Sequence, residues 1–166
     1  MGSCGEVTTC EALANTALLR IHLPDLKIRF VKVVDLFKLI DRDQHLHGLT
    51  AHEHKTIFTG NVSCTFDFHS HTWLIHRLTH GRLGQRNLVV CGYKKEGNID
   101  TPLELAIRNG TDRYSLAIDA MDRIRSLANK GAATREALLN EQIGAKNYAY
   151  YEGLEPEYTE KWVWPL

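Results

Sequence analysis

Residues 62–81 read VSCTFDFHSHTWLIHRLTHG, and this stretch contains one strand pattern followed directly by one helix pattern. Every second residue of Val62–Phe68 is apolar, which is the period of a strand with one buried face. Across Thr72–His80 the apolar residues recur at helical spacing, and Gly81 is well suited to end that helix. A strand followed at once by a helix is the repeating unit of α/β proteins.

The rest of the chain alternates between the same two patterns. Thr8 or Thr9 predicts the start of a helix that Pro24 ends. The other predicted strands cover residues 27–34 and 88–93, and the other predicted helices cover residues 51–58, 101–109, 112–127 and 132–147. We therefore predict an α/β fold with three layers, in which helices cover both faces of a mostly parallel sheet. The strand at 88–93 is apolar enough to be central.

We expect a single domain over residues 1–166 with an aromatic tail at 148–166. Gly2–Gly5 has the pattern of a strand-to-helix turn, with almost no strand ahead of it. We therefore expect the first strand to be truncated and the sequence to be a piece of a longer polypeptide. The aromatic residues of the tail exceed what a monomer needs to expose, so we expect them to dock against a neighbouring domain or subunit. They are Tyr148, Tyr150, Tyr151, Trp162 and Trp164.

The composition excludes several classes of protein. Lysines and arginines number 20, as do aspartates and glutamates, so the chain has no basic excess for nucleic acid or an anionic membrane. No apolar run is long enough for a transmembrane helix or a secretory signal. The four cysteines form no C-x-x-C pair, which favours a reduced, cytoplasmic location.

The nine histidines raise the question of a metal site. His76 and His80 lie one helical turn apart, as zinc ligands on one helix face would. Arg77 stands where the metalloprotease motif His-Glu-x-x-His has its glutamate. We expect no metal, and interpret these histidines as a polar helix face and loop residues. A zinc enzyme built on His76 and His80 remains the alternative, and it predicts stoichiometric metal in the purified protein.

The sequence also lacks the common motifs of nucleophilic catalysis and phosphate binding. The sequence has no Gly-x-Ser-x-Gly elbow, and its glycine pairs lack the lysine of a phosphate-binding loop. The stretch Gly92–Gly97 follows the carboxyl end of a predicted strand, the edge where open α/β sheets bind ligands. Lys94, Lys95 and Glu96 are therefore candidates for an anion or interface contact, and we expect no catalytic residue.

Several stretches taken together resemble the C-terminal domain of phosphoketolases. They are residues 3–9, 19–29, 33–36, 47–49, 73–79, 92–97 and 101–102, and their order and spacing match over residues 3–127. The resemblance implies a fold like the transketolase C-terminal domain. Departures occur at residues 69–73, where the family has His-Gly-Tyr-Pro-Trp, and at residues 98–101 and 103–105, which indicates a divergent branch.

Phosphoketolases use thiamine diphosphate and magnesium to cleave xylulose 5-phosphate or fructose 6-phosphate with phosphate, as aldehyde-lyases that give acetyl phosphate and an aldose phosphate. In that family, preceding domains bind the cofactor and carry the catalytic residues. The resemblance implies that this chain holds no cofactor, is inactive alone, and packs against the N-terminal and pyrimidine-binding domains of a homo-oligomer.

This resemblance suggests a role for the opening stretch. We expect its helix to face other domains, with His69 closing the strand, Trp73 and Ile75 holding the helix in place, and His76 or Arg77 reaching a partner. The alternative is a free-standing regulatory module in which the loop after Tyr93 binds a nucleotide or a phosphorylated metabolite.

Overall fold

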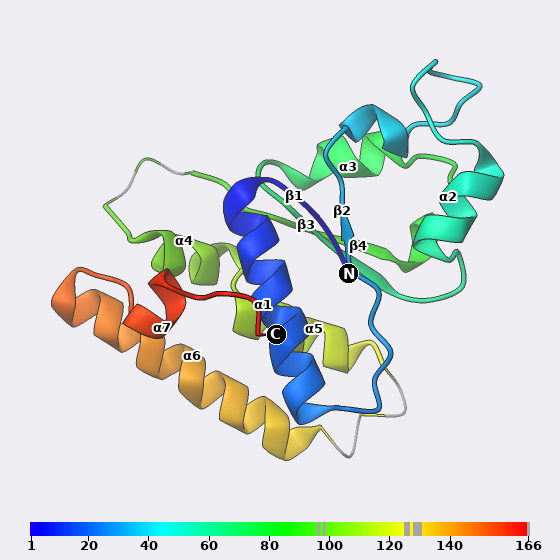
Figure 1. Ribbon diagram of the computed structural model, residues 1–166. Helices are drawn as coiled ribbons and strands as arrows, with labels where there is room; N and C mark the ends of the chain where they lie inside the picture. The colour runs from blue at the N-terminus through cyan, green and yellow to red at the C-terminus, as the bar shows by residue number, and fades with distance from the viewer. Residues whose placement is uncertain (96, 98, 125–126, 128–130, 166) are drawn as a thin grey trace.

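Four parallel strands form the sheet of the computed structural model, which describes residues 1–95, 97, 99–124, 127 and 131–165 (Figure 1). The sheet order is β2-β1-β3-β4, and every strand pair is parallel. The strands are β1 (Gly2–Cys4), β2 (Val31–Lys32), β3 (Cys64–Phe68) and β4 (Leu88–Gly92). The predicted parallel sheet is confirmed, whereas the prediction that residues 88–93 form a central strand is wrong. Among the described strands β4 lies at an edge, and β1 and β3 are central.

Helices cover both faces of the sheet, as predicted (Figure 1). On one side lie α1 (Glu6–His22), α4 (Pro102–Asn109), α5 (Arg113–Asp122) and α6 (Ala132–Glu152). On the other side lie η1 (Leu36–Leu39), α2 (Ala51–Phe58) and α3 (Thr72–Leu78). The short helix η2 (Gln85–Asn87) precedes β4, and the short helix α7 (Glu157–Glu160) lies within the C-terminal tail.

The two faces of β3 differ in chemistry because its side chains alternate. Phe66 and Phe68 point into an apolar core with Ile75 of α3, and this burial stabilises the fold by about 2 kcal/mol for each side chain. Thr65 and Asp67 occupy the other face and are buried toward α1 and α5. The sheet therefore packs on an apolar layer on one side and on a partly polar layer on the other.

The start of α1 differs from the prediction. The helix begins at Glu6, because the hydroxyls of Thr8 and Thr9 donate back to the carbonyls of Cys4 (2.9 Å) and Gly5 instead of capping a later start. Gly5 has φ +114°, and a Cβ on it would overlap the Cβ of His69. Only glycine fits this turn without strain.

Other boundaries were predicted with mixed success. Thr50 and Thr101 form capping boxes with the glutamates three residues on, and Gly110 ends α4 at φ 65°, all as the sequence indicates. The predicted strand at 27–34 is reduced to β2, and the helices predicted to end at residues 80 and 127 end at 78 and 122. Helix α6 instead extends five residues past its predicted end at 147. Tertiary packing decides such ends.

Candidate functional site

The carboxyl ends of β1, β3 and β4 meet at one edge of the sheet, and His69 lies between them. Its backbone N–H donates to Cys4 O (3.0 Å), and the N–H of Tyr93 donates to Phe68 O (2.8 Å). The rings of His69 and Tyr93 pack with centroids 4.9 Å apart. His69 therefore closes β3, as predicted, and it is fixed by both neighbouring strands.

Burial lowers the pKa of His69, the Lys95 charge lowers it further, and Glu6 partly offsets both effects. His69 Nδ1 is buried and has no hydrogen-bond partner among the described residues. Both the burial and the nearby Lys95 thus disfavour the charged form of the ring.

The loop after β4 is only partly described. Lys94 is half-buried, and its carbonyl accepts a hydrogen bond from the Asn109 side chain (3.1 Å). Lys95 is exposed, close enough for its charge to affect His69. Glu96 lies outside the described residues. The structure thus brings Lys95 to the same edge as His69, and their roles as anion or interface contacts remain predictions.

Helix α3 follows β3 and presents the other candidate side chains. Ile75 is fully buried in the core, as expected for a residue that holds the helix in place. Trp73 is 64% exposed, so the prediction that it too holds α3 in place is wrong. His76 and Arg77 are exposed on the same helix. An exposed tryptophan on a well-packed helix is a candidate contact with another surface.

Arg82 fixes the loop that lies beside α3. Its Nε donates to Leu39 O (3.0 Å), and its Nη2 donates to the carbonyls of Ile40 and Leu49 (2.7 Å for Leu49). Its Nη1 pairs with Asp41 (2.9 Å), and the Arg82 side chain is only 3% exposed. One buried guanidinium thus binds both ends of the loop 41–49. No pattern in the sequence indicates this role of Arg82.

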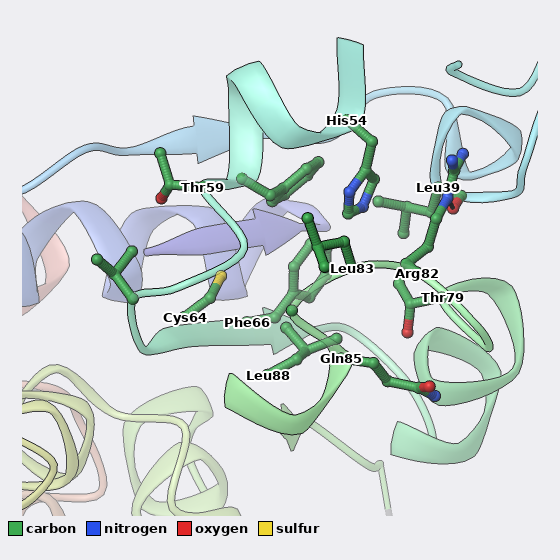
Figure 2. Close-up of a pocket in the computed structure, with 13 residues that line it drawn as sticks. Leu39, His54, Thr59, Cys64, Phe66, Thr79, Arg82, Leu83, Gln85 and Leu88 are labelled. Atoms are coloured by element: carbon green, nitrogen blue, oxygen red, sulfur yellow. Dashed lines mark hydrogen bonds between the residues drawn. The ribbon is translucent and has the colours of Figure 1, made fainter. Parts of the chain in front are cut away.

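Beside Arg82 lies a small, partly open cavity, which Figure 2 shows with His54, Leu39 and Phe66 at its wall. Burial and the Arg82 charge lower the pKa of His54 to about 4, and its ring stacks on Phe58 at 4.8 Å. The cavity volume is about 30 Å³, which leaves room for a few water molecules at most. It is too small for a metabolite.

A larger concavity of about 480 Å³ lies between α1, α4 and the C-terminal tail. Three of its charged side chains already have partners. Arg113 binds Glu11 through Nη2 (2.6 Å) and Nε (3.1 Å), and Glu155 accepts from Leu103 N (2.8 Å). Trp162 lies over the Arg113 guanidinium at 5.8 Å. Glu11, Arg113 and Glu155 are therefore engaged within this chain.

The aromatic residues of the tail divide into two groups. Trp162 and Trp164 are half-buried and lie over arginines of this same chain, Arg113 and Arg20, and their docking against another domain stays a prediction. Tyr150 is 74% exposed.

The histidines form no metal centre in the described part of the chain, where no group of three His, Cys, Asp or Glu side chains could hold an ion. Helix α3 ends at Leu78, so His80 is not on the same helix as His76. His52 is exposed on α2 while His54 is buried. Among the described residues, no helix is both long enough and apolar enough to cross a bilayer.

Comparison with known proteins identifies the family. Residues 1–164 match the family described as "XFP C-terminal domain". Three relatives named "Probable phosphoketolase" come from Synechococcus elongatus (50% identical over 166 residues), Thermosynechococcus vestitus (51% over 166 residues) and Methylococcus capsulatus (48% over 165 residues). The alignments cover 99–100% of this chain and 20–21% of each relative.

The chain thus spans about one-fifth of the length of the relatives it matches, and it corresponds to their C-terminal region. The match extends over the sheet, the carboxyl edge with His69, and α3. The predicted resemblance is therefore confirmed, and the chain belongs to the family of phosphoketolase C-terminal domains.

Proposed function

We propose that this chain is the structural C-terminal domain of a thiamine-diphosphate-dependent phosphoketolase. The parent enzyme is an aldehyde-lyase that cleaves xylulose 5-phosphate or fructose 6-phosphate with inorganic phosphate, giving acetyl phosphate and an aldose phosphate in the cytoplasm. The family match over residues 1–164 carries this proposal. Relatives about five times as long carry the name phosphoketolase, so the substrates belong to the whole enzyme.

The residues described do not fit the cofactor. Magnesium is bound by several oxygen ligands, and no suitable group of His, Cys, Asp and Glu occurs in the described part of the chain. The buried carboxylate of Glu11 is already engaged by Arg113. We therefore assign thiamine diphosphate and magnesium to the preceding domains, and assign no catalytic step to this chain.

The domain supports the enzyme by packing. We propose that His69, Trp73, His76, Arg77, Lys94, Lys95 and Glu96 face the N-terminal and pyrimidine-binding domains or a second subunit of a homo-oligomer. The exposure of Trp73 supports this role, because a large aromatic side chain that serves only the fold is usually buried, and His76 and Arg77 are accessible on the same helix.

A hybrid enzyme tests the proposal. This chain replaces the matched region of the Synechococcus elongatus relative, and acetyl phosphate formation from xylulose 5-phosphate is measured with thiamine diphosphate and magnesium. We expect activity in the hybrid and none in the isolated chain. Activity in the isolated chain, or an inactive hybrid beside an active parent, would contradict the proposal.

A further inference from the structure

An exposed apolar surface lies beside the carboxyl edge of the sheet. Four large apolar side chains form it, on the segments that follow β2 and β3. We name them the carboxyl-edge platform: Val34 (85% exposed), Phe37 (51%), Leu46 (76%) and Trp73 (64%). A monomer exposes single apolar residues routinely, but a group of this size on adjacent elements marks an interaction site.

The elements that carry the platform are neighbours in the fold. Leu36 and Leu39 of η1 share one core cluster with Ile75 of α3, so Phe37 and Trp73 extend from two neighbouring elements. In Figure 1 the two elements lie side by side at the top of the sheet. Phe37 stacks on His45 with centroids 4.4 Å apart and planes 7° apart, which joins the loop of Leu46 to η1.

Hydrogen bonds also hold the backbone of the platform rigid. Arg82 binds the carbonyls of Leu39, Ile40 and Leu49, so the loop that carries Leu46 is fixed at both ends. The Asp35 carboxylate accepts the N–H of Phe37 at 2.9 Å and fixes the start of η1. An exposed surface whose backbone is already ordered loses little entropy on binding, which is the property of a docking site.

We propose that this platform docks the part of the phosphoketolase polypeptide that precedes this domain, in the same subunit. The inference rests on the proposed function. The chain covers 20–21% of its relatives and corresponds to their C-terminal region, so about four-fifths of such an enzyme is present to cover the platform. Trp73 is the expected centre of the contact, because tryptophans dominate interface energies.

A second exposed apolar stripe serves as the control. Leu139 (41% exposed), Ile143 (53%) and Tyr150 (74%) lie on α6, on the other side of the sheet. Their helix packs on α4 and α5. Because this stripe is also apolar but lies on another part of the surface, comparing it with the platform tests where the contact is made.

Hydroxyl-radical footprinting locates the contact without any substitution. The isolated chain, at low and at high concentration, is compared with the active hybrid enzyme described above. We expect oxidation of Phe37, Leu46 and Trp73 to fall by about fivefold or more in the hybrid, while Ile143 and Tyr150 change by less than about twofold. Equal oxidation of Trp73 in both would overturn the docking proposal even if the hybrid is active.

The same comparison separates other occupants. Protection of Trp73 in the isolated chain at high concentration alone would assign the platform to a second copy and overturn the proposal. An inactive hybrid with a protected platform would refute the proposed function while supporting the docking site.

Substitutions then measure the contribution of the contact. The N-terminal four-fifths of the relative is produced separately, and its dissociation constant for this chain is measured. We expect Phe37→Asp with Trp73→Asp to weaken binding by about 30-fold or more, and Ile143→Asp to change it by less than about threefold. Thermal unfolding of each isolated variant verifies that it folds, and equal affinities for folded variants would overturn the proposal.

Discussion

Asp67 offers a sharp test of the polar layer between the sheet and α1. Its side chain is fully buried, and neither carboxyl oxygen has a hydrogen-bond partner among the described residues. Burial raises the pKa of Asp67 to about 9, and the carboxylates of Glu11 and Asp112 raise it as well. The folded protein therefore keeps a proton on Asp67 at neutral pH. Replacing Asp67 with Asn removes this proton requirement while nearly preserving the shape of the side chain.

The free energy involved follows from the pKa difference. Below about pH 4 both the folded and the unfolded chain hold the proton, so the ionisation of Asp67 does not change the free energy of unfolding. As the pH rises from about 4 to about 9, only the unfolded chain releases it, and stability falls by about 1.4 kcal/mol per pH unit. At pH 7 the stability lost in this way is at most about 4 kcal/mol.

Urea unfolding at several values between about pH 5 and pH 8 measures the effect. We expect Asp67→Asn to be more stable than wild type at pH 7 by about 2–4 kcal/mol, less than the full figure because the buried amide also lacks partners. The gain should grow steadily with pH. The exposed Asp25→Asn variant is the control and should follow wild type. A gain that stays constant from pH 5 to pH 8 would refute the reasoning.

Three further substitutions test the parts of the fold that hold the carboxyl edge and α1. Arg82→Met should lower the free energy of unfolding by about 3–5 kcal/mol, because it leaves buried carbonyls unpaired. It should also speed amide hydrogen exchange in the loop 41–49, and unchanged exchange there would contradict the role of Arg82. Gly5→Ala should lower the free energy of unfolding, measured in urea, by about 2 kcal/mol or more, because Gly5 has φ +114° and an added Cβ would overlap His69. Gly144→Ala is the control and should not destabilise the chain, because Gly144 lies in α6 with open space at its Cβ. Glu11→Gln should lower the free energy of unfolding by about 3 kcal/mol, because it breaks the buried ion pair with Arg113. A decrease below about 1 kcal/mol would show that the pair contributes little to stability.

Local signals in the sequence predicted the elements that local chemistry controls. The capping boxes at Thr50 and Thr101 form as their spacing indicates, because each needs only residues within one helical turn. The strand at β3 was predicted from its alternation, and the resemblance to phosphoketolases is borne out by the family match. The edge position of β4 could not be predicted, since an apolar strand has the same pattern at an edge that helices cover.

The missed residues depend on contacts between distant segments. Arg82 binds carbonyls more than thirty positions away, and Glu11 binds Arg113 across 102 positions. No spacing rule links such pairs. Asp67 did give a signal, because a carboxylate between Phe66 and Phe68 in a central strand must point to a buried opposite face. Reading both faces of that strand would have predicted the polar layer.

Rigidity connects Arg82 with the proposed docking of the platform. Ordering a free loop costs about 1 kcal/mol or more per residue, and a partner that had to order the loop 41–49 would lose most of its binding free energy. The hydrogen bonds of Arg82 order that loop during folding, so docking does not bear this cost. Arg82→Met should therefore weaken binding of the preceding domains although Arg82 is buried and cannot touch them. If the folded variant binds with wild-type affinity, the loop is ordered by other contacts and Arg82 acts on stability alone.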